Sequence, residues 1–262
     1  MKAAREGSGS GQFPKLTVDV TYDLRLMEKG EHQGKVLFRR YDKEKKEHVF
    51  INKPMTGIFI GIFFRASCHD NKYGTKGATY VTAPYLRSEN MIIFSPGREK
   101  KFFKGTKKQI IQWLSEQGAP ANLKVKTCIL LATEHGLFEV DTNCALAIHE
   151  FSKIKEEDLF ANFIRLTPDL YDPNDISIPK EVHEVLGKFR EKNPPRYASV
   201  SLSKAFTDED VKAYNVDKHL DMYITWKEHI LGGGVSPVED KDEHTQETTS
   251  HPPKTEEDDL PF

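Results

Sequence analysis

The chain changes character twice along its length, and these changes constrain the fold more than any other feature. Between residues 15 and 152, apolar residues fall in runs of strand length, and the longest, Ile58 to Phe64, is too short to span a membrane. Beyond about residue 153 the chain becomes acidic, with apolar residues at helical spacing. From residue 236 onward Pro, Thr, Glu and Asp dominate. The pattern predicts a mainly β body with added helices and a disordered acidic tail.

The body contains a series of expected strands separated by polar turns. Residues 16–21 alternate between apolar and polar side chains, as in a half-buried strand. Residues 35–41 and 47–51 flank a charged turn and predict a hairpin. Residues 57–66 are rich in Ile and Phe, which predicts a strand buried on both faces, with Phe59, Phe63 and Phe64 in the core. Further strands are expected at 79–81, 90–95, 123–133 and 136–141.

Helices are expected at three places. Thr106 is a candidate N-cap for a helix that ends near Gly118. Pro179 marks the start of a second helix. The last amphipathic segment runs from Asp208 to Leu231. Its predicted buried stripe consists of Val211, Tyr214, Leu220, Tyr223, Trp226 and Ile230.

Short strands with a helix before the last hairpin are typical of an OB-like β-barrel with insertions, although a β-sandwich gives a similar pattern. The predicted organisation has four parts. They are a disordered N-terminus at 1–14, an OB-like domain at 15–152, an acidic helical extension at 153–231, and a disordered acidic linker and tip at 232–262. The pattern leaves open whether 153–231 packs on the barrel or is separate, and whether the protein is a homo-oligomer.

Charge is distributed unevenly along the chain. Residues 1–130 contain 24 Lys and Arg against 12 Asp and Glu, whereas residues 131–231 contain 12 against 19. Residues 232–262 contain 2 against 9. A basic half attached to an acidic tail is typical of a protein that binds a polyanion with one part and contacts proteins with another.

Several classes of function find no support in the motifs. The three cysteines, Cys68, Cys128 and Cys144, are widely spaced, which argues against a disulfide framework and favours a reducing cytoplasm. No secretory signal is visible in residues 1–11. The sequence contains no P-loop, dinucleotide fingerprint, H-E-x-x-H or C-x₂-C pair, and neighbouring Cys68 and His69 point to opposite faces of an extended strand. We therefore expect no enzymatic activity, no cofactor and no metal site.

Cations and aromatic residues interleave in three places of the basic half. Single-stranded nucleic acid is bound by cations that follow the phosphates and by aromatic faces on which bases stack. Each such residue alone is more often surface or core, but the interleaving favours binding, with Tyr41, Tyr73 and Phe103 as the favoured stacking platforms. The candidate residues are Arg39, Arg40, Tyr41, Lys45 and Lys46; Lys72, Tyr73, Lys76, Tyr80 and Arg87; and Arg98, Lys100, Lys101, Phe103, Lys104, Lys107 and Lys108.

The sequence of the last seven residues, from Glu256 to Phe262, is four carboxylates followed by Leu-Pro-Phe. It resembles the C-terminal tip of bacterial and phage single-stranded DNA-binding proteins. In that family the tip recruits replication, recombination and repair proteins. The resemblance assigns partner binding to Asp258, Asp259, Leu260, Pro261 and Phe262, and it favours an OB-like body.

The resemblance implies a non-enzymatic protein that coats single-stranded DNA with little sequence preference, in the cytoplasm of a bacterial host. The body is about twice as long as the common bacterial form and lacks its strand motifs, which favours a divergent member encoded by a phage or mobile element. One alternative is an adaptor or inhibitor that uses the tip without binding DNA strongly. Another is a nuclease or other nucleic-acid enzyme with an unrecognised site.

Overall fold

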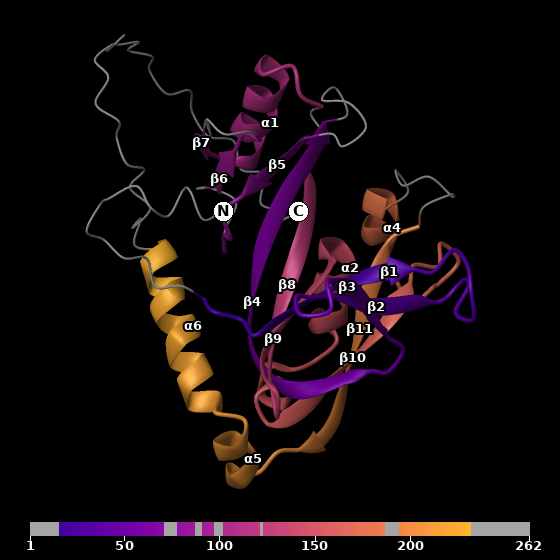
Figure 1. The fold of residues 1–262 in the computed structure, drawn as a ribbon, viewed down its shortest axis with the longest axis vertical. Coiled ribbons are helices and arrows are strands. Elements are labelled where there is room, and N and C mark those ends of the chain that lie inside the picture. The colour runs from indigo at the N-terminus through magenta and orange to yellow at the C-terminus, as the bar shows by residue number, and fades with distance from the viewer. Residues whose placement is uncertain are drawn as a thin grey trace.

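The computed structural model describes residues 16–70, 78–86, 91–96, 102–120, 123–186 and 194–231 (Figure 1). The predicted N-terminal segment 1–14 and the acidic tail 232–262 lie outside the described residues. The strands are β1 (Val20–Leu26), β2 (Val36–Asp42), β3 (Glu47–Ile51), β4 (Met55–Asp70), β5 (Ala78–Thr82), β6 (Met91–Phe94), β7 (Phe102–Gly105), β8 (Lys124–Thr133), β9 (Gly136–Asn143), β10 (Asn162–Leu170) and β11 (Arg196–Ala205). The helices are α1 (Lys107–Glu116), α2 (Cys144–Ser152), α3 (Glu156–Leu159), α4 (Lys180–Leu186), α5 (Asp208–Ala213) and α6 (Val216–Leu231).

The described strands join into one mixed sheet. Its order is β3-β2-β1-β9-β8-β4-β5-β6-β7, and β10 pairs with both β4 and β11. Neighbouring strands are antiparallel except β1 and β9, which run parallel. The prediction of a mainly β fold with added helices is confirmed. The finer prediction of an OB-like barrel is not confirmed by this order.

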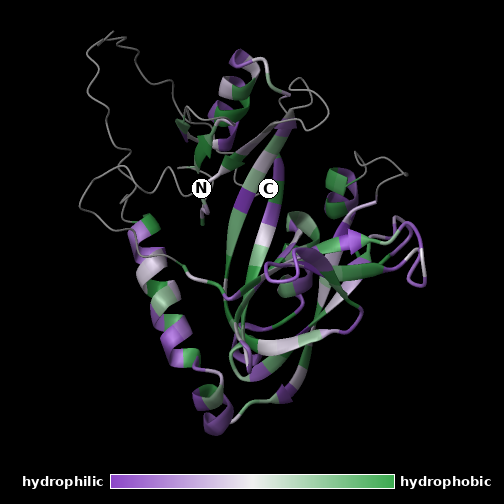
Figure 2. Cartoon of the chain, in the orientation of Figure 1, coloured by the Kyte–Doolittle hydropathy of each residue, from purple (hydrophilic) through white to green (hydrophobic). Residues whose placement is uncertain are grey.

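Strand β4 is long enough to pair with different strands at its two ends. Its first residues pair with β10, most of its length pairs with β8, and its last four residues pair with β5. Figure 1 shows β5, β6, β7 and α1 grouped at the far end of β4 and β8. Figure 2 shows that β4 and β8 both change from hydrophobic to hydrophilic toward that end. At that end the polar residues of the two strands alternate with residues such as Ala66 and Cys68, which are buried beneath α1.

Alternate residues of β4 and β8 contribute to two separate cores, because successive side chains of a strand point to opposite faces. Phe59 and Ile129 belong to a core shared with β1, β2, β9, β10 and β11. Phe63 and Leu130 belong to a second core, on the face that α6 covers. Phe59 and Phe63 are buried as predicted, whereas Phe64 is half-buried.

Helix α6 packs closely against β4 at Gly61. A Cβ added at Gly61 would overlap the ring of Tyr223, so a side chain at Gly61 would push the helix away. The Tyr223 hydroxyl donates a hydrogen bond of 2.7 Å to the carbonyl oxygen of Ile62, and the ring of Trp226 lies 5.3 Å from that of Phe63. Tyr223 and Trp226 are buried, which confirms these two members of the predicted stripe.

A third core lies beneath α1 at the far end of β4. Residues of α1, β4, β5 and β6 meet in it, with Ile110 and Leu114 of α1 fully buried. Thr106 is the N-cap, as predicted, and forms a capping box with Gln109. Helix α1 therefore covers one face of β5, β6 and β7.

The region 153–231, predicted as a helical extension, contains helices α3 to α6 and also two strands. β10 and β11 pair with each other along most of their length, and β10 joins the main sheet through β4. Helical periodicity was expected throughout, so these strands were missed. Among the described helices, none combines the length and the apolar character needed to cross a membrane.

Candidate nucleic-acid interface

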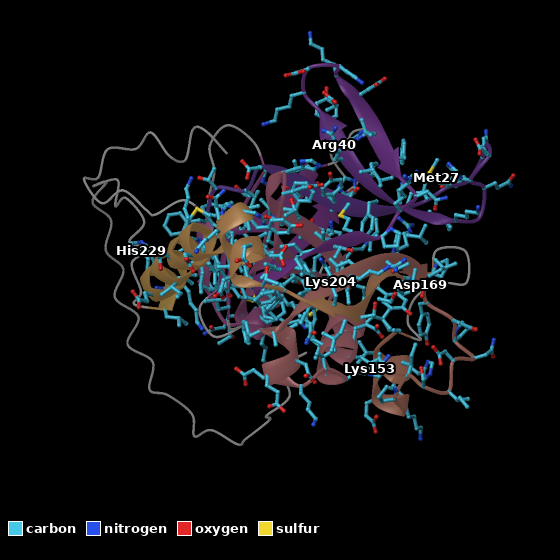
Figure 3. All side chains as sticks on the ribbon, turned by 90° about the horizontal axis from the view of Figure 1, so that it is seen from below. Met27, Arg40, Lys153, Asp169, Lys204 and His229 are labelled. Carbon is cyan, nitrogen blue, oxygen red and sulfur yellow. The ribbon has the colours of Figure 1, made fainter. Side chains whose placement is uncertain are left out.

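The first predicted cluster lies on the hairpin of β2 and β3, where its two arginines form ion pairs. Arg39 makes a bidentate ion pair with Asp23 of β1, in which the Arg39 Nε lies 2.8 Å from the Asp23 Oδ1. Arg40 lies 3.6 Å from the carboxylate of Asp42. Figure 3 shows Arg40 on a hairpin that projects from the rest of the ribbon, away from His229 on α6. Arg39 and Arg40 are therefore partly neutralised, which weakens them as free phosphate contacts.

The hairpin turn exposes two further predicted cations. The Asp42 carboxylate accepts hydrogen bonds of 3.1 Å from the backbone amides of Glu44 and Lys45. These bonds lower the pKa of the Asp42 carboxyl, and the bond from Lys45 has the largest effect. Lys46 has a φ of 54°, a left-handed conformation that completes the tight turn. Lys45 and Lys46 are both exposed. The Asp42 carboxylate thus holds the turn that presents these lysines to solvent.

Aromatic rings accompany these cations on the outer face of the hairpin. Tyr41 is 53% exposed, and its ring lies 5.4 Å from that of His48, its cross-strand partner. Phe50 is 41% exposed and pairs with Arg39, so it lies on the same face as Tyr41. Phe50 and His48 were not among the predicted binding residues. The sequence signal that could have found them is the predicted hairpin itself, because its register sets Phe50 opposite Arg39 and His48 opposite Tyr41.

The third predicted cluster lies where β7 enters α1. Lys104 and Lys108 are exposed and Lys107 is half-buried, with no acidic residue in the first helical turn. Cations at a helix N-terminus oppose the helix dipole, and the free backbone amides there favour an anion. This end of α1 therefore combines side-chain and backbone groups that attract a phosphate.

The predicted aromatic residues near α1 are placed differently from Tyr41. Tyr80 is buried in the core beneath α1, 6.0 Å edge-to-face from Trp113, and so is not at the surface where it was expected. Phe103 is half-buried and stacks on Trp113, with ring centroids 5.8 Å apart. Its neighbour Phe102 is 42% exposed and points to the opposite face. The exposed ring on β7 is thus Phe102, which the sequence reading did not select.

The remaining predicted residues lie outside the described part of the chain. They are Lys72, Tyr73, Lys76, Arg87, Arg98, Lys100, Lys101, Asp258, Asp259, Leu260, Pro261 and Phe262. The described clusters do not meet, because β3 and β7 are the two ends of the sheet path. Figure 1 likewise shows the β2–β3 hairpin and the β7–α1 unit apart from each other.

A charged group on β4, β8 and β9 was not anticipated from the sequence. The Arg65 guanidinium makes a bidentate ion pair with the carboxylate of Glu139, which is 1% exposed. It also lies 4.9 Å from the centroid of the Phe63 ring. Asp141 lies 3.9 Å from Arg65 and accepts a bond of 3.1 Å from Lys126. Two cations thus neutralise two carboxylates on one face of the sheet.

This group contains a possible set of metal ligands. The Cys128 Sγ, one carboxylate oxygen of Glu139 and one of Asp141 all lie within 4.8 Å of one another. However, burial raises the pKa of the Cys128 thiol, which donates a bond of 3.1 Å to Asp141 and is therefore protonated. A metal ion would also have to displace Arg65 and Lys126. The geometry favours an ion-pair network over a metal centre.

Comparisons of this chain with protein-family models, with curated proteins and with solved structures found no match.

Proposed function

We propose that this protein binds single-stranded DNA without catalysis and recruits replication, recombination or repair proteins through residues 258–262. The observation that carries the proposal is the sequence from Glu256 to Phe262, which resembles the tip of bacterial and phage single-stranded DNA-binding proteins. In this proposal the protein acts in the cytoplasm of a bacterial host and is encoded by a phage or mobile element.

Exposed lysines and aromatic rings in the described residues support DNA binding. Lys45 and Lys46 accompany Tyr41 on the hairpin, and Lys104 of β7 and Lys108 of α1 lie where β7 leads into α1. In the proposed mechanism the lysines capture phosphates and the rings stack on bases, so that binding depends little on sequence and weakens with salt. Exposed rings favour a strand with unpaired bases over a duplex, whose bases are already stacked on each other.

An OB-like body remains part of the proposal. One core cluster draws buried residues from seven strands, β1, β2, β4, β8, β9, β10 and β11, as expected of strands that surround a common interior. Its members include Tyr22 of β1, Phe38 of β2, Leu166 of β10 and Ala198 of β11. The helices and β5 to β7 would then be additions to that unit.

The test is a titration of fluorescent oligo-dT, and of its duplex, with the full chain and with residues 1–235. The proposal predicts salt-sensitive binding that prefers the single strand, and that is unchanged or stronger without the tail. A lack of binding by both forms would overturn DNA binding. If the tip alone then retained a replication protein, the adaptor function would replace the proposal. Metal-dependent cleavage of the labelled strand would instead indicate a nuclease.

A further inference from the structure

The face of β5, β6 and β7 opposite α1 carries a row of residues that the register aligns. Lys124 pairs with Ser67, Ser67 with Val81, Val81 with Phe94, and Phe94 with Phe102. Residues paired across neighbouring strands point to the same face of a sheet. The five side chains therefore lie side by side across β8, β4, β5, β6 and β7, and we call them the cross-strand row.

The cross-strand row is on the opposite side of the sheet from the core beneath α1. Phe103 and Ile93 belong to that core, and Cys68 lies fully buried in it. Each is adjacent in sequence to a member of the row, and adjacent residues of a strand point to opposite faces. Phe102 is exposed and Phe94 is half-buried, so the row ends in two neighbouring rings that are not enclosed by a core.

Cations lie at both ends of the row, Lys104 beside Phe102 on β7 and Lys124 at the other end on β8. Lys124 and Lys104 are exposed, and among the described residues neither forms an ion pair with a carboxylate. The adjacent pair, Arg65 and Lys126, adds two cations that Glu139 and Asp141 balance. The surface is therefore net basic and partly aromatic. Among polyanions, one with accessible base faces matches both properties.

We propose that the cross-strand row is a base-stacking track for single-stranded DNA, with Phe102 and Phe94 as platforms and Lys124 and Lys104 as phosphate contacts. The proposal rests on the proposed function and assigns it a site of which only Lys104 was expected from the sequence. Five strands about 4.8 Å apart span about 19 Å. At the duplex rise of about 3.4 Å per nucleotide the track accommodates at most about six nucleotides, and an extended strand places fewer on it.

The test compares two exposed phenylalanines. Phe102→Ala removes a ring from the track, and Phe160→Ala removes a ring that is 51% exposed and packs against Phe59, outside the row. We expect Phe102→Ala to weaken oligo-dT binding by about 5- to 150-fold and Phe160→Ala to leave it unchanged. Lys124→Ala should reduce the slope of log K against log salt by about 0.7.

A second measurement does not depend on a variant. Oligo-dT with 5-iodouracil at single positions should photocrosslink to the peptide that contains Phe102 or Phe94. If wild-type protein binds oligo-dT but Phe102→Ala and Lys124→Ala bind as tightly as it does, and crosslinks map to the β2–β3 hairpin alone, the track is refuted while DNA binding stands. If the wild type does not bind oligo-dT, the proposed function fails instead.

Discussion

Replacing Arg65 with methionine should destabilise the protein strongly and in a pH-dependent way. Glu139 is 1% exposed, and its two carboxylate oxygens both contact the Arg65 guanidinium. Methionine keeps much of the apolar length over Phe63 but removes the charge. The substitution thus leaves a buried carboxylate without its main partner.

The magnitude follows from the burial of the two partners. Breaking a buried ion pair by removing one partner costs about 3–5 kcal/mol. The Arg65 side chain is 34% exposed and Lys126 remains near Asp141, so solvent and a second cation compensate part of the loss. We therefore expect a decrease of about 3 kcal/mol in the free energy of unfolding at pH 7.

The pH dependence gives the test its specificity. Burial raises the pKa of the Glu139 carboxyl, and loss of Arg65 raises it further. The penalty is fully present above the raised pKa of the folded variant, and it shrinks as the pH falls through that value because a protonated carboxyl needs no counter-charge. Urea unfolding of wild type and variant, followed by circular dichroism at pH 7 and pH 5, measures both effects.

A matched surface pair serves as the control. Arg25 lies 3.7 Å from Glu28 with both side chains well exposed, so Arg25→Met should cost less than about 1 kcal/mol at either pH. The double variant Arg65→Met/Glu139→Leu should recover most of the lost stability, since Asp141 keeps Lys126 as its partner and Glu139 no longer leaves an unpaired buried charge. A loss below about 0.5 kcal/mol for Arg65→Met, or one equal at both pH values, would refute the reasoning.

Four further substitutions have distinct expected outcomes. Tyr41→Ala should weaken oligo-dT binding by about 5- to 150-fold in a fluorescence titration without lowering stability, and unchanged affinity would remove the hairpin from the interface. Thr106→Ala should lower the urea midpoint by the equivalent of about 1 kcal/mol, because it removes the capping box of α1. Gly61→Ala should destabilise more than Tyr223→Phe, which loses a single hydrogen bond worth about 1 kcal/mol, and the reverse order in thermal melts would contradict the packing of α6.

Local signals in the sequence predicted much of the fold. The hairpin of β2 and β3 and the N-cap at Thr106 were predicted closely, because turn and capping chemistry act within a few residues. The strands β10 and β11 were missed because their acidic surroundings and Pro168 masked the β pattern. Their pairing with each other and with β4 is a long-range effect that no local pattern shows.

The candidate site was only partly predictable. Interleaved charge indicated Tyr41 and the lysines of the β2–β3 turn, which are exposed. Composition could not separate Phe102 from Phe103, because the face that each occupies depends on which side of β7 α1 covers. Arg65 was missed for a related reason, since its partner Glu139 lies far along the chain on a different strand.

The most direct measurement is the affinity of the full chain for oligo-dT at several salt concentrations. The account predicts binding that falls steeply with salt, with a slope of log K against log salt of at least about −2, equivalent to three phosphate contacts at about −0.7 each. It also predicts that a duplex of the same length binds more weakly. Absence of binding at low salt, or equal affinity for duplex and single strand, would contradict the account.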